Sequence, residues 1–191
     1  MKVVNKGMVD PVVNENTLKQ TKDKPSRELL GYIRAALAYL DRYGGPRARI
    51  QRTLERRARR KGLEDEAARQ IISAAMHELD QLNIIDDATF AAGKAAALRR
   101  RGASKRQALA KLAMSGIEPQ LAAEALDELD SRSEDDAERV AAIRYAQRRR
   151  LGPWRLDQQT REERRERDIA ALTRTGFSVG LSIAVIDGIE D

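Results

Sequence analysis

The sequence has no cysteine and a single histidine, His77, and both shortages exclude kinds of functional site. Without cysteine the chain has no disulfide bond, thiolate metal site or cysteine nucleophile, which fits a reducing compartment. A lone histidine cannot build a histidine-rich metal site, so we assign His77 a structural or surface role. Aromatic residues are only 4% of the 191 residues, too few to support an argument for base stacking.

Long apolar runs and catalytic motifs are missing as well. No stretch approaches the roughly 20 apolar residues of a membrane span, and the N-terminus lacks the apolar segment of a signal peptide. No glycine loop of the P-loop or dinucleotide type is present. Asp86 and Asp87 form a carboxylate pair, but helix capping is the better interpretation. We therefore expect a cytoplasmic, non-enzymatic protein with no catalytic residue, metal, cofactor, small-molecule substrate or membrane partner.

Charge is what the sequence has in abundance. Charged residues make up 35% of the chain, and 36 Lys and Arg against 30 Asp and Glu leave a net charge of +6. That excess favours polyanions or acidic protein surfaces as partners. The dominant residues Ala, Leu, Arg, Glu and Lys are good helix formers, and no segment alternates Val, Ile and Thr as a strand would. The composition predicts an all-α fold.

A unit recurs three times along the chain. Each copy has a helical run ending in Gly, a second run rich in Arg and Lys that ends in Gly and an apolar residue, and a third apolar run. The second runs end at Gly62, Gly116 and Gly176. Recurrence at such a period is typical of small helical modules that pack on one another. Function is then expected along a face of the array rather than in a closed pocket.

This recurrence divides the chain into three repeats, 26–84, 85–131 and 132–191. Residues 1–25 show no helical period and are expected to form a flexible N-terminal arm. The third repeat carries an almost wholly charged insertion near 158–167, which should extend its second helix into solvent. Contacts between repeats are expected through Leu79, Leu82, Ile84, Phe90 and Leu129.

Several local features follow from capping and periodicity. Ser26, Ser104 and either Asp86 or Asp87 are expected to cap helices, because their side-chain oxygens can accept an orphan backbone N–H. Ser133 with Asp136 resembles a capping box, although Glu or Gln is usual at the second position. In the helix that follows, the spacing predicts that its buried face consists of Val140, Ile143 and Ala146.

Three groups of basic residues are the clearest chemical signal. Arg49, Arg52, Arg56 and Arg59 are spaced three, four and three apart, so they line one side of a helix, and guanidinium rows suit rows of phosphates or carboxylates. The alternative is a solvated face balanced by nearby acids, and basic residues at helix C-termini also complement the macrodipole. The candidate binding residues are Arg47, Arg49, Arg52, Arg56, Arg59, Arg60, Arg99, Arg100, Arg101, Lys105, Arg106, Lys111, Arg148, Arg149 and Arg150.

The order of these landmarks resembles the RecX family of recombinase regulators. The resemblance covers about 30–188. Its carriers are the run 36–40, the pattern Leu-Asn-Ile-Ile-Asp-Asp at 82–87 with Phe90 and Ala91 after it, Gly116 with Ile117, and Arg-Thr-Gly-Phe at 174–177. The charged insertion and the turn at Gly45 and Pro46 depart from the family pattern.

The resemblance implies an elongated, curved array of three tandem three-helix repeats without a catalytic centre. It further implies binding to RecA protein and to the RecA–DNA filament, with inhibition of ATP hydrolysis, strand exchange and co-protease activity. These activities belong to recombinational repair and the SOS response. Some members also bind DNA, so single- or double-stranded DNA backbone is an expected partner of the basic residues. A monomer is expected.

Two other functions stay open at the level of sequence. The second and third helices of a repeat could mimic a helix-turn-helix, which would make the chain a DNA-binding transcriptional regulator. Against that, the Arg-rich helix is the second one, and few Asn or Gln residues are available to read adenine edges. An RNA-binding or ribosome-associated helical protein is the weaker option. Acids concentrate between Glu118 and Glu138, which would keep a face off nucleic acid, meet a basic partner or serve solubility.

Overall fold

The computed structural model describes residues 25–189, and within that range the chain is helical with no strand, which confirms the predicted all-α class. Apart from Pro25, the predicted arm 1–25 lies outside the described residues. The helices are α1 (Arg27–Tyr43), α2 (Arg47–Arg60), α3 (Asp65–Gln81), α4 (Asp87–Arg100), α5 (Lys105–Ser115), α6 (Pro119–Ser131), α7 (Ala137–Arg149), α8 (Gln158–Thr175) and α9 (Val179–Asp187), with a short 3₁₀ helix, η2 (Gly152–Trp154), before α8.

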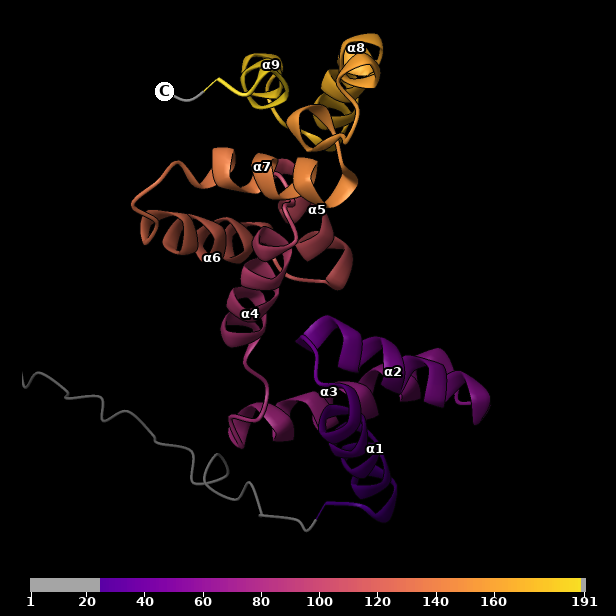
Figure 1. The fold of residues 1–191 in the computed structure, drawn as a ribbon. Coiled ribbons are helices and arrows are strands. Elements are labelled where there is room, and N and C mark those ends of the chain that lie inside the picture. Colours follow the sequence, from indigo (N-terminus) through magenta and orange to yellow (C-terminus); the bar gives the residue numbers. More distant parts are fainter. Residues whose placement is uncertain (1–24, 190–191) are drawn as a thin grey trace, which may run out of the picture.

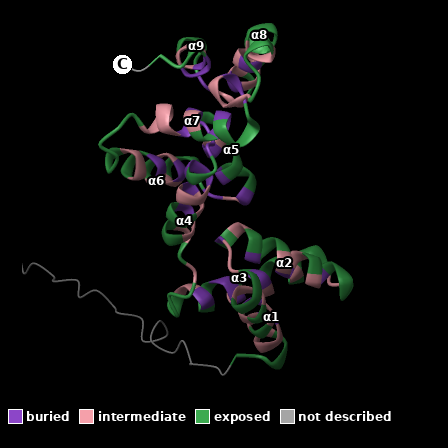
Figure 2. Cartoon of the chain, in the orientation of Figure 1, coloured by how far each residue is buried: buried purple, intermediate pink, exposed green. Residues whose placement is uncertain are grey.

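The buried apolar side chains form three separate clusters, each built by three successive helices (Figures 1 and 2). Cluster 1 joins α1, α2 and α3 around residues such as Tyr32, Leu54 and Leu79. Cluster 2 joins α4, α5 and α6 around Leu112 and its neighbours. Cluster 3 joins α7, α8 and α9, with Leu172 fully buried among them. The three groups follow one another along the molecule from α1 to α9.

Helix starts follow the predicted capping chemistry in most places. Ser26 Oγ accepts the Leu29 N–H at 3.1 Å, and Ser104 Oγ accepts the Gln107 N–H at 3.1 Å. Asp86, one of the two candidates, caps α4 by accepting the Thr89 N–H at 2.8 Å. These contacts satisfy backbone donors that the first turn of a helix leaves without a partner.

The capping box predicted at Ser133 is wrong. Ser133 lies in a bend before the helix, and α7 begins only at Ala137. Its cap is Asp136, whose Oδ1 accepts the Glu138 N–H at 2.9 Å and the Arg139 N–H at 3.3 Å. An Asp directly before the helix satisfies these donors itself, so no residue three positions earlier is needed.

The buried face predicted for α7 is right at Ala146 and wrong at its other two positions. Ala141, Ala142, Tyr145 and Ala146 are its buried residues, whereas Val140 and Ile143 are only half-buried. The larger side chains lie at the flanks because small residues let the helix approach the chain closely at Gly102. A Cβ on Gly102, whose φ is +72°, would lie 2.5 Å from the Tyr145 backbone nitrogen.

The apolar contacts predicted between repeats are partly wrong too. Leu82 is 60% exposed and Ile84 is 41% exposed, so neither closes a junction. Leu79 is buried in cluster 1, while Phe90 and Leu129 pack against cluster 2, so each of these three serves its own cluster. The junctions instead rely on glycines and polar contacts: the Arg47 N–H, at the start of α2, donates to Asp87 Oδ1 at 2.7 Å.

The charged insertion 158–167 forms the first half of α8, and most of its residues are exposed, as expected. Two bidentate pairs anchor its surroundings. Arg165 donates to both carboxylate oxygens of Asp187 on α9, at 2.7 and 2.6 Å. Arg155 donates to both oxygens of Asp168, at 2.7 Å each, and the Gly152 N–H adds a third bond at 2.9 Å.

Candidate functional site

The Arg-rich face of α2 is held outward by the apolar face opposite to it. Ile50, Leu54 and Ala58 recur every four residues and are buried in cluster 1. The spacing of the helix then directs the intervening positions to solvent. Five exposed arginines of α2 form no ion pair within residues 25–189. They are Arg49, Arg52, Arg56, Arg59 and Arg60, which we call the α2 basic row.

Arg47, also predicted for this site, is engaged elsewhere. Its Nη1 donates to Asp80 at the end of α3, and its backbone N–H donates to Asp87. The hydrogen bond to Asp80 outweighs burial and raises the pKa of the Arg47 guanidinium. The residue is still exposed, but its charge is balanced by two carboxylates, so it contributes less to a net positive surface than the α2 basic row.

Arg57 is also on α2 but is not part of the α2 basic row, because it packs against cluster 1. Its guanidinium carbon lies 5.5 Å from the centroid of the buried Tyr32 ring, within cation–π range. Burial raises the pKa of the Tyr32 hydroxyl, helped by Glu28 and opposed by Arg57. Lys61 lies 5.3 Å from the same ring and 3.7 Å from Glu28. Both cations therefore contact the Tyr32 ring of cluster 1, Arg57 from a half-buried position and Lys61 from an exposed one.

Arg99 is the clear correction among the predicted binding residues. It is 6% exposed and lies between clusters 2 and 3. Its Nε donates to Asp130 Oδ1 at 2.9 Å and its Nη2 to Asp130 Oδ2 at 2.5 Å, while Nη1 donates to Glu138 Oε2 at 2.6 Å and to the Ala103 carbonyl at 3.0 Å. These bonds use four of the five N–H groups of the guanidinium, and its burial keeps it away from an outside partner. Arg99 joins α4, α6 and α7 and is not part of a binding surface.

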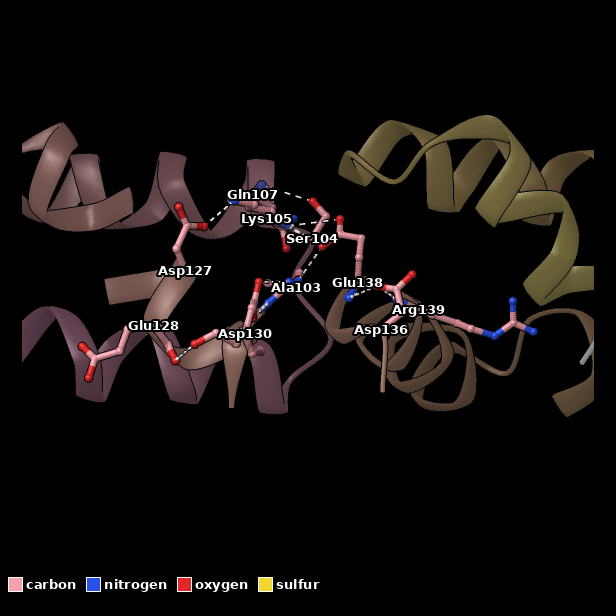
Figure 3. Close-up of polar contacts among 12 residues, drawn as sticks. Ala103, Ser104, Lys105, Gln107, Asp127, Glu128, Asp130, Asp136, Glu138 and Arg139 are labelled. Carbon is pink, nitrogen blue, oxygen red and sulfur yellow. Dashed lines mark hydrogen bonds and ion pairs between the residues drawn. The ribbon is translucent and has the colours of Figure 1, made fainter. Parts of the chain in front are cut away.

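The same network uses some of the segregated acids (Figure 3). The Glu138 carboxylate also accepts the Lys105 N–H at 3.2 and 3.1 Å, so a residue of α7 caps the start of α5. Lys105 Nζ forms an ion pair with Asp127 on α6. Lys105 was predicted as a binding residue, and this pairing balances its charge in the same way as that of Arg47.

The remaining predicted cations of clusters 2 and 3 are exposed and form no ion pair within the described part of the chain. Arg148 and Arg149 lie 5.6 and 6.0 Å from the Tyr145 ring, and Arg148 Nη1 also donates to the Arg101 carbonyl, which brings α7 against the end of α4. Arg106 Nη2 donates to the Arg174 carbonyl at 3.4 Å. The full set is Arg100, Arg101, Arg106, Lys111, Arg148, Arg149 and Arg150.

Sequence reasoning missed one cation beside the α2 basic row. On α4, Lys94 Nζ lies 5.5 Å from the Phe90 ring centroid, and the amine is close enough to Arg49 to interact with its charge. Burial, followed by the charge of Arg49, lowers the pKa of the Lys94 amine. The i, i+4 spacing of Phe90 and Lys94 in the sequence could have predicted the contact with the ring. The proximity of Lys94 to Arg49 could not be predicted, because it depends on how clusters 1 and 2 pack.

Other features of the described residues do not assemble a catalytic centre. A groove of about 730 Å³ between α2 and α3 is lined by both signs of charge, including Arg59, Arg69, Asp65 and Asp80, with the exposed His77 among its lining residues. No group of His, Asp and Glu able to hold a metal ion occurs in residues 25–189. None of the helices described is long and apolar enough to cross a membrane.

The described part of the chain is all-helical, and exposed arginines lie along one face of α2. Comparison with known proteins identifies its family: the chain belongs to the RecX family of regulatory proteins. It is 39% identical to the regulatory protein RecX of Myxococcus xanthus over 158 residues, covering 80% of this chain and 82% of that protein. It is 31% identical to regulatory protein RecX of Amycolatopsis mediterranei, covering 73% and 74% of the two chains.

A third regulatory protein RecX, from Corynebacterium efficiens, is 30% identical over 127 residues, covering 63% of this chain and 60% of that one. These relatives are named regulatory proteins rather than enzymes. No protein-family model matches the chain. No solved structure matches it either.

Proposed function

We propose that this protein binds RecA and its nucleoprotein filament and inhibits RecA's ATP hydrolysis, strand exchange and co-protease activity, in recombinational repair and the SOS response. The observation that carries the proposal is the α2 basic row on a member of the RecX family: exposed guanidinium groups in line that form no ion pair within residues 25–189. Such a row fits the regularly spaced phosphates of a DNA backbone and the acidic patches of a protein wound on it.

The proposed arrangement is an elongated, curved array of three tandem three-helix repeats, 26–84, 85–131 and 132–191. The three separate apolar clusters support it. In this arrangement the α2 basic row binds first, and the exposed cations at the α4–α5 turn and at the end of α7 continue the contact. The protein acts without a catalytic centre, by blocking the subunit motions or filament growth that turnover requires, and it enters this complex as a monomer in the cytoplasm.

The distribution of acids argues against the transcription-factor alternative. α6 is the third helix of cluster 2, the position of a recognition helix in a helix-turn-helix. It exposes Glu124, Asp127 and Glu128, and carboxylates facing a phosphate backbone would be repelled. We therefore keep the RecA modulator as the only proposed function.

The direct test is RecA-dependent ATP hydrolysis on single-stranded DNA with increasing amounts of this protein. We expect hydrolysis to fall, and unchanged hydrolysis at saturating protein refutes the proposal. The double variant Arg52→Glu, Arg56→Glu should weaken inhibition and DNA binding while helical content is kept. The matched control is Arg69→Glu, Arg132→Glu, because both of these exposed arginines already pair with acids on their own helices.

Salt separates the contributions of phosphate and protein contacts. If the α2 basic row binds phosphates, the affinity for DNA falls linearly with salt concentration on logarithmic axes, by a slope of about 0.9 for each phosphate neutralised on duplex DNA. The Arg52→Glu, Arg56→Glu variant should then show a shallower slope than the wild type. An equal slope with weaker binding would instead assign these arginines to a protein contact.

A further inference from the structure

The second helices of the three clusters meet end to end inside one chain. The end of α5 reaches the start of α2 at Gly116, whose φ is +91°: a Cβ there would lie 2.6 Å from the Ala48 Cβ. The end of α8 reaches the start of α5 at Gly176, with φ +111°: a Cβ there would lie 2.6 Å from Ser104 Oγ and 2.8 Å from Arg106 Nε. Ala48 and Arg106 are both the second residue of their helix. The two junctions therefore use equivalent positions.

Hydrogen bonds at the α8–α5 junction show what holds such ends together. Ser104 Oγ donates to the Thr175 carbonyl at 2.6 Å, and Arg106 Nη2 donates to the Arg174 carbonyl at 3.4 Å. The last carbonyls of a helix have no partner inside it, and the first turn of the next helix supplies the donors. The negative end of one helix dipole also faces the positive end of the next, which is favourable.

The C-terminal end of α2 presents backbone carbonyls of the same kind. α2 ends at Arg60 with Lys61 as its C-cap, and Gly62 follows with φ +68°; a Cβ on Gly62 meets no atom within 4 Å. Within residues 25–189, the Arg60 and Lys61 carbonyls, which correspond to those of Arg174 and Thr175, accept no hydrogen bond. The stack of second helices thus stops at an open end.

The start of α8 is the opposite, equally open end of the stack. Asp157, Gln158 and Gln159 are exposed, and α8 lies at the far end of the molecule from α2 (Figure 1). The charged insertion lengthens α8 by these turns, so its first turn stands clear of cluster 3. Gln159 is the second residue of α8 and so corresponds to Arg106. Its Nε2 donates to Glu163 Oε1 at 3.2 Å, and the second N–H of the amide can donate to a carbonyl.

We propose that the first turn of α8 in one copy of this protein docks on the Gly62 end of α2 in another copy, continuing the stack head to tail. Both ends carry charges of both signs that can pair across the contact: Asp157, Glu162 and Glu163 lie near the start of α8 with Arg161, while Arg59 and Arg60 at the end of α2 are followed by Glu64 and Asp65. Because the two ends differ and the contact does not close on itself, each docked copy leaves a free end for the next.

This association is weak for a monomer free in solution and becomes effective when a polymer holds neighbouring copies at high local concentration. It gives the charged insertion a role that its own cluster does not require. The contact involves only this chain but shares Arg59 and Arg60 with the α2 basic row, so sedimentation without DNA or RecA is what separates it from the proposed function.

The test exploits the absence of cysteine from the chain. The full-length variant Arg60→Cys, Gln159→Cys is treated with a short bismaleimide cross-linker, alone at high concentration and bound to poly(dT) single-stranded DNA. The two cysteines lie at opposite ends of one molecule, so they should join different copies and give a ladder of dimers, trimers and longer products. Circular dichroism checks that each variant keeps the helical content of the wild type.

The matched control is Arg60→Cys, Glu124→Cys, which moves the second cysteine to an exposed position on α6. A ladder specific to the first pair supports the proposal. Equal products from both pairs, or no trimer with or without poly(dT), overturn it.

A second arm without cysteine uses sedimentation in the absence of DNA. The variant Glu162→Arg, Glu163→Arg should stay at the monomer mass where the wild type grows with concentration, and adding Arg59→Glu, Arg60→Glu to the same chain should restore that growth. A wild type that stays monomeric at every concentration tested, together with no ladder, also overturns the proposal.

Discussion

Replacing Arg99 by methionine distinguishes its role within the fold from that of the exposed arginines beside it. Met keeps much of the aliphatic volume but removes the guanidinium, so Asp130 and Glu138 lose their shared partner and the Ala103 carbonyl loses a donor. Breaking a buried ion pair from one side costs roughly 3–5 kcal/mol, since the carboxylates left behind are uncompensated. The Asp130 and Glu138 side chains are 20% and 29% exposed, so water replaces part of what is lost.

We therefore expect the free energy of unfolding to fall by about 3 kcal/mol, near the lower end of that range. For a chain of this size, each kcal/mol shifts Tm by about 2–4 °C, so a drop of roughly 6–12 °C should be visible in a thermal melt followed by circular dichroism. Arg100→Met is the matched control: it removes the next arginine, which is exposed, and should change stability by less than about 0.5 kcal/mol.

Binding assays complete the comparison. Arg100→Met should weaken DNA binding at unchanged Tm, and Arg99→Met should lower Tm first. The reasoning fails if the free energy of unfolding of Arg99→Met lies within about 1 kcal/mol of the wild-type value while the variant binds less DNA. Arg99 would then contact DNA and would not be an internal bridge.

Three further changes test the packing and the internal ion pairs. Leu54→Ala, in a fully buried side chain of cluster 1, should cost about 2–5 kcal/mol by urea denaturation, and an unchanged midpoint would contradict the assigned α2 register. In Gly102→Ala the new residue must adopt a φ of +72°, and its Cβ would lie 2.5 Å from the Tyr145 backbone nitrogen, so we expect the free energy of unfolding to fall by about 2–4 kcal/mol. Gly62→Ala, at the open end of α2, should lower it by about 1 kcal/mol. Equal decreases for the two variants would exclude close packing at Gly102. Burial alone would raise the pKa of Asp168, but the hydrogen bonds from Arg155 and Gly152 outweigh it and hold the pKa below its usual value. The stabilisation is therefore complete above the unfolded pKa of about 3.9 and is lost as pH falls through the folded pKa. The difference in unfolding free energy between wild type and Asp168→Asn, measured by urea denaturation, should stay constant from neutral pH to about 4 and become smaller below it. A difference that becomes smaller well above pH 4 would show that Asp168 is not the group responsible.

Local rules predicted most of the helices because their signals lie within a few residues. Ser26 and Ser104 cap helices as expected, and α2, α5 and α8 end within two residues of Gly62, Gly116 and Gly176. The insertion at 158–167 also formed a helix extension as its charge pattern indicated. These features depend on backbone donors and φ values that only neighbouring residues can satisfy.

The rest depended on contacts between segments far apart in the sequence. In α7, alanines occupy several faces, so periodicity alone does not choose the buried one, and the close approach at Gly102 decides it. Arg99 stands next to Arg100 in one basic run, and nothing local distinguishes them. Arg99 is buried because Asp130 and Glu138, 31 and 39 residues away, converge on it.

The burial of Arg99 also bears on how the exposed cations work. A three-helix unit of about 50 residues buries too small a share of its surface to be very stable alone. The contacts between neighbouring units must therefore both stabilise the chain and orient the units. Arg99 does this between clusters 2 and 3, as the bond from Arg47 to Asp87 does between clusters 1 and 2. A partner that contacts cations already held at fixed separations meets a smaller loss of conformational freedom on binding. Under the proposed function, the burial of Arg99 therefore strengthens the binding of the exposed arginines, and the same arginines on a flexible chain would bind a polymer less tightly.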